Sequence, residues 1–387
     1  MVEESFIKLK AYCEAEHFKG WDPYDGLNSA LFNALPFSKM RWSRLAWIQL
    51  FKRSPINLRR ITGVTKGYNP KGIGLFLHGY CNLYQVEQKP DYLEMIDFLA
   101  NKVISLKTEG YDGNCWGYNF DWQARAFFQP KNMPTVVATT FIATALMHAY
   151  EVTGNRNYLN NAIQTKNFIL NNLNRTYDAD GDFAFSYSPE DKTQVFNASL
   201  LGSRLLCQIY KYTGEKELLD IARKSVSFCC KHQQQNGAWA YGTLPFHQWI
   251  DNFHTGYNLE CIDVYQQISG DKSFDKHLQK GLTYYLETFF TEEGKPKYYN
   301  NQLYPIDVHT TSQLIVTLSS MNCLAEHKQL ADKVLSWTVN NMQDKSGYFY
   351  YQLKKRFNSK IPYMRWAQAW MFYGMSEYLK FNTMNRD

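Results

Sequence analysis

The chain has 387 residues, of which 45% are hydrophobic, and a formal net charge of +6 from 42 Lys and Arg and 36 Asp and Glu. A mean hydropathy of −0.46 and the lack of an apolar run of about 18 residues argue against a membrane-spanning protein. The basic residues form short clusters rather than a long stripe interleaved with aromatic residues, which argues against nucleic acid as a partner.

The start of the chain and its cysteines indicate a compartment. The sequence MVEESFIKLKAYCEAEHF carries acidic residues early and has no uninterrupted apolar core, so it does not resemble a signal peptide. The 8 Cys lie mainly in apolar helical contexts and show no paired spacing typical of disulfide-rich secreted proteins. We therefore expect reduced thiols and a cytoplasmic protein.

Helical periodicity begins at the N-terminus and becomes repetitive from about residue 67. An amphipathic helix is predicted over residues 3–17, and a second helix over residues 40–53 ends before Ser54-Pro55. The repetitive part holds five pairs of helices and one last helix. The pairs are 70–87 with 91–107, 134–153 with 156–173, 195–213 with 216–233, 253–269 with 273–290, and 308–322 with 325–341, and the last helix is 362–380.

Similar turns join the helices of most pairs, and similar linkers join the pairs. Gly154, Gly214 and Gly270 each stand where a left-handed residue ends a helix, and a polar residue follows to start the next one. The longer linkers combine a turn with a short aromatic strand, as in DGNCWGYNFDW, NGAWAYG and SGYFYYQ. A period of about 50–60 residues with two helices per unit indicates a repeat architecture.

One outer position of the repeat is vacant, because six first helices have only five partners. The N-terminal helix, within residues 1–17, fills this position in our interpretation and closes a ring of six hairpins. We therefore predict an all-α fold, an (α/α)6 toroid with short aromatic β-hairpin linkers at one end. Residues 1–387 form a single domain in this prediction, with residues 18–66 as an N-terminal excursion and residues 67–387 as the helical-hairpin repeats.

The hairpin period and the three linker sequences quoted above resemble those of the six-hairpin glycosidase superfamily, over roughly residues 67–387. This resemblance implies a hydrolase, a lyase or an epimerase that acts on a polysaccharide or an oligosaccharide. It also implies polysaccharide assembly as a setting, with assembly proteins as further partners. Two other toroid groups fit less well, since the chain lacks the Asp-x-Asp-Asp acid of class II terpenoid cyclases and carries only His78-Gly79 of the Cys-His-Gly zinc motif of lanthionine cyclases.

In such a ring the long linkers lie at one end, where the first helix of each pair begins and its positive dipole end favours an anion. Two acid-plus-histidine clusters recur at such helix starts, Asp251 with His254 and Asp307 with His309. We predict these four residues as catalytic. The residues that we expect to bind the substrate are Asp121, Arg125, Asn197, Trp239, Tyr241, Arg365, Trp366 and Gln368.

Three reactions are compatible with this set. Hydrolysis needs two carboxyl groups roughly 5–10 Å apart, for which Asp251 and Asp307 are the candidates. A lyase or a uronyl C5-epimerase needs a base for the C5 proton, such as His254 or His309, and a group such as Arg365 that neutralises the carboxylate. The two histidines favour the second chemistry slightly. We therefore expect an enzyme acting on a uronate-containing glycan, with a non-catalytic toroid that binds a glycan or a protein as the alternative.

The candidate residues also have structural interpretations. An Asp in the first turn of a helix is ordinarily an N-cap, and Arg365 can pair with a carboxylate at the rim. The aromatic side chains of Trp239 and Trp366 either stack on a sugar or plug the end of the ring. His78 and His148 lie on apolar faces and are expected to be packed core residues.

The sequence predicts neither a metal nor a cofactor. The alternating acids over residues 178–182 lack the distant bidentate Glu of a calcium loop. Cys229, Cys230 and His232 fall on a helix without a second cluster of ligands nearby in the sequence. We therefore expect a carbohydrate substrate to be the only small-molecule ligand.

Overall fold

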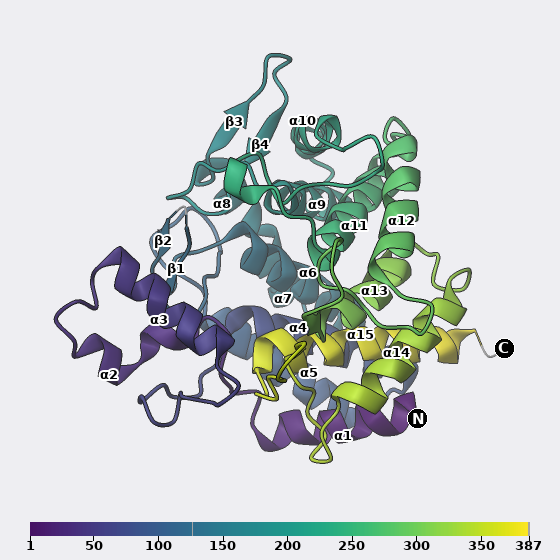
Figure 1. The fold of residues 1–387 in the computed structure, drawn as a ribbon. Helices are drawn as coiled ribbons and strands as arrows, with labels where there is room; N and C mark the ends of the chain where they lie inside the picture. The colour runs from purple at the N-terminus through teal and green to yellow at the C-terminus, as the bar shows by residue number, and fades with distance from the viewer. Residues whose placement is uncertain (126, 386–387) are drawn as a thin grey trace.

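The computed structural model describes residues 1–125 and 127–385 and shows two concentric layers of helices (Figure 1). In the inner layer each helix packs against the next, and the last packs against the first, so that this layer is a closed ring. The inner helices are α4 (Pro70–Val86), α6 (Val136–Thr153), α9 (Phe196–Thr213), α11 (Asn252–Ser269), α13 (His309–Ser320) and α15 (Trp370–Met384).

An outer helix follows each of the first five inner helices. The outer helices are α5 (Pro90–Ser105), the pair α7 (Arg156–Ile163) and α8 (Thr165–Asn171), α10 (Glu217–Lys231), α12 (Asp275–Phe289) and α14 (Lys328–Met342). The N-terminal helix α1 (Val2–Ala15) contacts α15 and α14 from outside. The predicted all-α (α/α)6 toroid is confirmed, although the expected helix over residues 156–173 is divided at Gln164.

Local signals set the ends of these helices. Asn69, Thr135 and Asp251 cap α4, α6 and α11, each accepting a backbone N–H bond from the residue three positions later. Gly154 and Gly214 end α6 and α9 with φ of 71° and 70°, the left-handed region that glycine adopts without strain. The sequence predicted these ends because capping depends on a few neighbouring residues.

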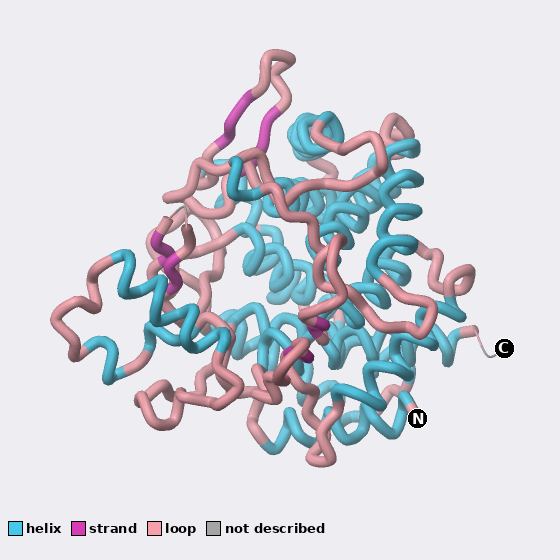
Figure 2. Tube along the Cα trace, in the orientation of Figure 1, coloured by secondary structure: helices cyan, strands magenta, loops and turns pink. Residues whose placement is uncertain are grey.

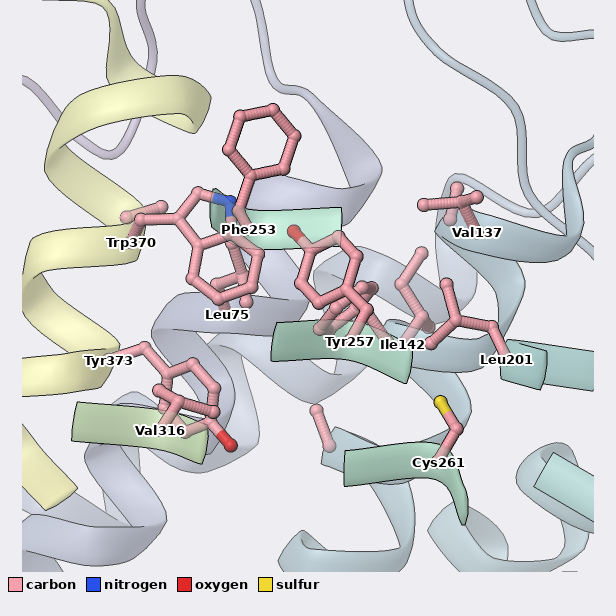
Figure 3. Close-up of a cluster of buried hydrophobic side chains, with 14 of the residues drawn as sticks. Leu75, Val137, Ile142, Leu201, Phe253, Tyr257, Cys261, Val316, Trp370 and Tyr373 are labelled. Atoms are coloured by element: carbon pink, nitrogen blue, oxygen red, sulfur yellow. The ribbon is translucent and has the colours of Figure 1, made fainter. Parts of the chain in front are cut away.

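The centre of the ring is filled by apolar side chains from the second and third turns of the inner helices (Figure 3). All six inner helices contribute buried residues to this cluster, among them Leu75, Ile142, Leu201, Cys261, Val316 and Trp370. Helix α6 is long and apolar enough to cross a membrane, but 72% of it is buried, as its place in the inner ring explains. The ring therefore has a solid centre, and a binding site must lie at one of its ends.

Within the described residues the strands form three two-stranded ladders in the linkers between the helices (Figure 2). They are β1 (Trp122–Gln123) with β2 (Phe128–Gln129), β3 (Arg175–Tyr177) with β4 (Phe183–Phe185), and β5 (Ile306–Asp307) with β6 (Gln352–Leu353). The last ladder joins two different linkers and pairs Asp307 with Gln352. The aromatic stretch of residues 238–240 forms no strand, and its Trp239 is buried.

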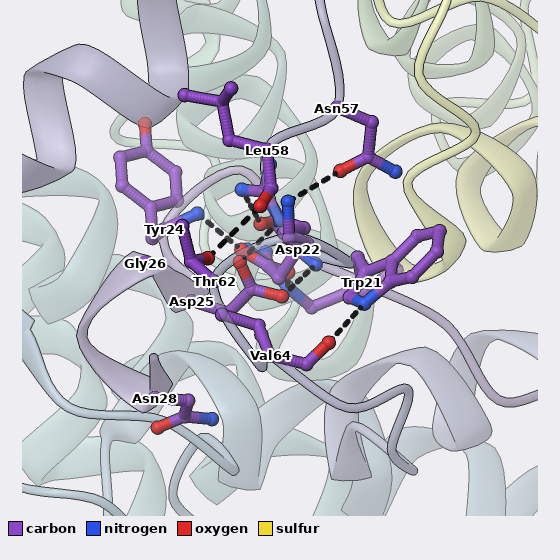
Figure 4. A network of polar contacts seen from close by, with 12 residues as sticks. Trp21, Asp22, Tyr24, Asp25, Gly26, Asn28, Asn57, Leu58, Thr62 and Val64 are labelled. Atoms are coloured by element: carbon purple, nitrogen blue, oxygen red, sulfur yellow. Dashed lines mark hydrogen bonds and ion pairs between the residues drawn. The ribbon is translucent and has the colours of Figure 1, made fainter. Parts of the chain in front are cut away.

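Residues 18–66 form an arm beside the ring, with the 3-10 helix η1 (Asp25–Asn28), α2 (Ala30–Asn33) and α3 (Arg41–Arg53), at the left of Figure 1. A buried polar network holds the base of this arm (Figure 4). Arg59 Nε donates to Asp25 Oδ1 at 2.6 Å, and Arg59 Nη2 donates to the carbonyl oxygen of Asp22 at 2.6 Å. The division of the chain into a single domain with this excursion stays a prediction.

A second ion pair ties the arm to the ring. Arg365 lies in η3 (Met364–Ala369), a π-helical segment that leads directly into α15. Its Nε and Nη2 donate to the two carboxylate oxygens of Asp22 at 2.5 and 2.8 Å, and both side chains are buried. Such a two-point contact fixes both position and orientation.

We expect Arg365→Met to lower the free energy of unfolding by about 3–5 kcal/mol, because the substitution leaves the Asp22 carboxylate buried without its partner. Urea denaturation followed by circular dichroism measures this change. The double variant Asp22→Asn with Arg365→Met removes both charges, and its loss should be smaller than that of Arg365→Met alone. Arg125→Met, at an exposed position, is the control and should change stability by less than about 0.5 kcal/mol.

Candidate active site

The N-terminal ends of the inner helices meet at one end of the ring, and their side chains form an aromatic wall there. The ring of His309 stacks between Trp370 and Phe253, with centroids 4.1 and 4.6 Å away. Phe141 of α6 and Tyr257 of α11 also pack against Trp370, at 5.3 and 5.8 Å. Four inner helices therefore bring their first turns to one place on the axis.

Asp251 and His254 form a hydrogen-bonded pair at the start of α11. Asp251 Oδ1 accepts the backbone N–H of His254 at 3.0 Å, which is the N-cap bond. Its Oδ2 lies 2.7 Å from His254 Nδ1 and also accepts a bond from Trp249 Nε1 at 3.1 Å. A carboxylate at Nδ1 fixes the tautomer of the imidazole and leaves Nε2 as the nitrogen for proton transfer. The His254 side chain is 22% exposed, so a ligand at this end of the ring can reach it.

Asp307 is enclosed by donors from three segments. Its carboxylate accepts bonds from the backbone N–H of His309 at 3.0 Å, from Trp366 Nε1 at 3.0 Å and from Gln352 Nε2 at 2.6 Å. Burial raises the pKa of Asp307 to about 6, and these donors oppose that rise. The bonds leave little of the carboxylate free, and the side chain is fully buried. Asp307 therefore positions Trp366 and the start of α13.

His309 follows Asp307 but is placed at the centre of the aromatic wall. Its Nε2 lies 3.2 Å from Tyr257 Oη, whereas its Nδ1 has no hydrogen-bond partner among the described residues. Burial lowers the pKa of His309 well below its usual value, and the charges of Lys71 and Arg365 lower it further. The imidazole is therefore neutral at pH 7.

Lys71 lies beside His309 and was not expected from the sequence. It is almost fully buried, and its ammonium nitrogen lies 4.1, 5.1 and 5.5 Å from the ring centroids of Phe141, Trp370 and Tyr257. Burial lowers the pKa of Lys71 well below its usual value, and the charge of Arg365 acts in the same direction. One sequence signal exists, because a Lys in the first turn of a helix faces the unfavourable positive end of the dipole.

Residues of the arm and of the linker before α13 surround this centre. Lys52 Nζ donates to Tyr24 Oη at 3.0 Å, and Tyr24 packs on Trp366 at 5.6 Å. Burial lowers the pKa of Lys52, but the Tyr24 hydroxyl raises it, with smaller contributions from Tyr299 and Asp307, and the net shift is upward. We call the end of the ring that is lined by Tyr24, Lys52, Tyr241, His254, Tyr299 and Trp366 the mouth of the ring.

The predicted residues Tyr241, Trp366 and Arg365 lie at the mouth. Tyr241 stacks on Trp249 at 4.5 Å and lies 4.7 Å from His254. Arg365 is fully engaged with Asp22, as the structural interpretation of the sequence had allowed. Asn197 is buried at the start of α9, where its Oδ1 has no hydrogen-bond partner among the described residues.

The other predicted binding residues are held by bonds of their own. Trp239 Nε1 donates to the Cys229 carbonyl oxygen at 3.0 Å, and the Gln368 side chain makes two 2.8 Å bonds with the backbone of Phe349. Asp121 accepts the Lys131 N–H at 2.6 Å, and the exposed Arg125 accepts a bond from Arg41 at its carbonyl oxygen. Their roles in binding stay predictions, and these bonds favour the structural interpretation.

A metal site is not evident at the mouth. Over residues 1–125 and 127–385, no three His, Cys, Asp or Glu side chains are grouped so that they could hold an ion. The side chains that converge are aromatic rings, two histidines, two lysines, one arginine and the carboxylates of Asp22, Asp251 and Asp307, each of which already accepts hydrogen bonds. Such a set suits an organic ligand with apolar faces and acceptor groups.

Comparison with known proteins identifies the fold. No protein-family model and no curated protein matches the chain. Its structure is similar to cellobiose 2-epimerase from Bacillus thermoamylovorans (TM-score 0.64, 14% identity, 81% of this chain and 88% of that chain). It is also similar to a GH76 α-mannanase from Bacteroides thetaiotaomicron (0.64, 12%, 81% and 87%) and to an unsaturated glucuronyl hydrolase specific for heparin (0.64, 11%, 100% and 97%). The chain therefore has the fold of the six-hairpin glycosidases, as the linker sequences predicted.

Replacing Lys71 by Met tests whether the enclosed amine is neutral. Because its folded-state pKa lies below the unfolded value of 10.5, the unfolded chain binds the extra proton, and Lys71 lowers the free energy of unfolding at neutral pH. We expect Lys71→Met to raise that free energy by about 1 kcal/mol or more near pH 7. The gain should shrink as the pH approaches 10.5, where the unfolded lysine also loses its proton.

Urea denaturation of both proteins at several pH values from neutral to alkaline measures this difference. The exposed Lys224 on α10 supplies a matched control, since Lys224→Met should leave stability within about 0.5 kcal/mol of the parent at every pH. A Lys71→Met protein that is no more stable than the parent near pH 7 would show that Lys71 is charged and stabilised in the folded state.

Proposed function

We propose that the chain is a carbohydrate-active enzyme that transfers a proton on a sugar, in an epimerase or lyase type of reaction. The substrate in this proposal is a uronate-containing oligosaccharide or polysaccharide, and the setting is cytoplasmic polysaccharide metabolism or assembly, with assembly proteins as further partners. His254 acts as a proton carrier and Asp251 orients it. The second proton carrier comes from the centre of the aromatic wall, where His309 and Lys71 lie.

The hydrogen-bonded pair of Asp251 and His254 is the observation that carries this proposal. A carboxylate 2.7 Å from Nδ1 both orients an imidazole and stabilises its protonated form, which is what a general base needs after it has taken a proton. The pair stands at the mouth, beside the stacked rings of Tyr241 and Trp249. Such rings bind the apolar C–H face of a pyranose.

The carboxylates themselves favour proton transfer over hydrolysis. A glycosidase needs one carboxyl group that donates a proton and another that attacks or activates water. Asp251 accepts three hydrogen bonds, and Asp307 is fully buried among its donors. Neither oxygen pair is free to contact a glycosidic bond, whereas His254 reaches the mouth.

Two further nitrogen bases, His309 and Lys71, lie at the aromatic wall beside His254, and two proton carriers suit a reaction that removes a proton and returns it on the other face of the sugar. Burial lowers the pKa of both His309 and Lys71 well below their usual values. Groups with pKa values shifted by burial and by one another cluster at working sites. Epimerisation uses both carriers, and β-elimination uses one to take the C5 proton and one to protonate the leaving oxygen.

The cations at the mouth support an anionic substrate. Arg365, the neutraliser expected from the sequence, is already paired with Asp22. Lys52 lies at the mouth beside Tyr24 and takes over the role of holding a carboxylate in this proposal, assisted by the N-terminal ends of the inner helices. The neighbouring structures include enzymes described as epimerases and one described as a glucuronyl hydrolase, which is in keeping with such a substrate.

The test is turnover of a panel of uronate-containing and neutral oligosaccharides in D2O, analysed by NMR and mass spectrometry. Proton transfer introduces deuterium at the reacting carbon, whereas hydrolysis does not place deuterium on carbon. We expect His254→Gln to lower kcat by about 100-fold or more with little change in melting temperature. His327→Gln, at the start of outer helix α14, is the matched control and should keep parental turnover.

The same experiment separates the alternatives. Hydrolysis products without deuterium on carbon, formed equally by the parent and by His254→Gln, would contradict the proposal. Binding of an oligosaccharide by the parent without turnover of any panel member would favour the non-catalytic toroid. We also expect Asp251→Asn to lower kcat, because the amide does not stabilise a protonated His254, whereas the N-cap of α11 is kept, since Asn caps a helix about as well as Asp.

A further inference from the structure

The whole basic excess of the chain lies in one short segment. From Gly26 to Lys66 there is no Asp or Glu, and eight basic residues occur, which leaves 34 basic and 36 acidic residues in the rest of the chain. The eight are Lys39, Arg41, Arg44, Lys52, Arg53, Arg59, Arg60 and Lys66. This segment therefore carries a positive charge on a protein that is otherwise close to neutral.

Half of these basic residues are exposed at the surface. Arg59 and Lys52 serve the buried network and the mouth, Lys66 pairs with Glu16, and Arg44 covers the ring of Phe128. The remaining four are exposed and have no ion pair among the described residues. They are Lys39, Arg41, Arg53 and Arg60.

The same segment exposes apolar side chains in an unusual number. Trp42 and Leu50 stand on the outer face of α3, where Trp42 is 75% and Leu50 is 50% exposed. With Ala46 between them, they follow a spacing of four residues, so they share one side of the helix. Ile48 and Phe51 point the other way and are buried against the base of the arm. Helix α3 thus carries apolar side chains on two sides. The side with Ile48 and Phe51 is covered by the rest of the protein, and the side with Trp42 and Leu50 is exposed.

Further exposed apolar residues flank this face. Of the sixteen large hydrophobic residues that are exposed in the described part of the chain, seven lie between residues 31 and 61. The other five of the seven are Leu31, Phe37, Met40, Ile56 and Ile61. A backbone bond from Leu31 N to the Thr62 carbonyl oxygen at 3.3 Å places Leu31 next to the loop that carries Ile61. We call residues 30–61, the outer part of the arm formed by residues 18–66, the basic arm; it lies at the left of Figure 1.

We propose that the basic arm docks on an anionic lipid bilayer. In this arrangement Trp42 and Leu50 enter the boundary between headgroups and acyl chains, and Lys39, Arg41, Arg53 and Arg60 contact lipid phosphates. A helix with an exposed apolar face and basic residues around it binds in this way, through buried apolar area and attraction to anionic lipids. A large exposed apolar patch on a soluble fold marks an interaction surface.

The combination of residues favours a bilayer over other polyanions. Nucleic acids and acidic polysaccharides offer charge to the basic residues, but they offer no hydrocarbon to Leu50, Ile56 and Ile61. The absence of acidic residues over residues 26–66 means that nothing in the segment repels a negatively charged surface. Since the segment also supplies Lys52 to the mouth, docking brings the mouth close to the membrane surface.

The test is co-sedimentation of the full-length protein with two kinds of vesicle, one of equal parts phosphatidylglycerol and phosphatidylcholine and one of phosphatidylcholine alone. We expect binding to the anionic vesicles at about 0.15 M salt, weaker binding at about 0.5 M salt, and at least tenfold weaker binding to phosphatidylcholine vesicles. The apolar variant Trp42→Ser with Leu50→Ser and the charge variant Arg41→Glu with Arg53→Glu should each weaken binding to the anionic vesicles at least tenfold.

Matched controls separate the arm from surface chemistry in general. Ile7→Ser removes an exposed apolar residue from the outer face of α1, and Lys224→Glu with Lys276→Glu reverses two exposed charges on α10 and α12. All four variants should keep the parental far-ultraviolet circular dichroism, and the two control proteins should bind as the parent does.

Three outcomes would overturn the proposal. The first is a parent protein that sediments equally with the two kinds of vesicle, or that sediments with neither of them. The second is unchanged binding of both arm variants. The third is a parent that does not bind vesicles but forms a dimer that Trp42→Ser with Leu50→Ser dissociates, which would make the arm an interface between two copies of the chain.

Discussion

Closure of the inner ring is the constraint on which the rest of the structure depends. Because α15 packs against α4, all six inner helices have neighbours on both sides, and nearly every residue of a helix such as α6 is buried. Each hairpin returns the chain to the same end, so the six inner helices start together there. Their N-terminal dipole ends, their caps and the linkers before them are therefore concentrated at the mouth, and the apolar residues beyond it close the axis.

The dry interior near the mouth gives the site its chemistry. Lys71 and His309 are ordinary side chains whose basicity is changed by the aromatic rings around them, since these rings remove the water that would stabilise a charge. His254, at the edge of this region, has a carboxylate instead as its partner. Enclosed bases with lowered pKa values and one partly exposed, oriented imidazole are a combination suited to moving protons on a bound sugar.

The N-terminal arm connects the site to the outside of the molecule. Its inner side is bound to the ring through the ion pair of Asp22 with Arg365, the ion pair of Asp25 with Arg59 holds its own base together, and it brings Tyr24 and Lys52 to the mouth. Its outer side carries the unpaired positive charges and the exposed apolar face of α3. Because one segment forms both surfaces, contact of the arm with a membrane and access to the mouth are linked by geometry.

The sequence by itself determined the helices, their ends and their closure into a toroid. These depend on periodicity and on single residues such as Gly154, Gly214 and the cap Asp251, which act on their immediate neighbours. It also indicated the positions of Asp251, His254, Asp307 and His309 at helix starts.

Only the tertiary structure decided which groups are available for chemistry. Asp307 is enclosed by Gln352 and Trp366, 45 and 59 residues away, and Arg365 is paired with Asp22, 343 residues away. Lys71 became a candidate base because distant rings surround it, and no local pattern encodes which distant side chains meet or how much water they exclude.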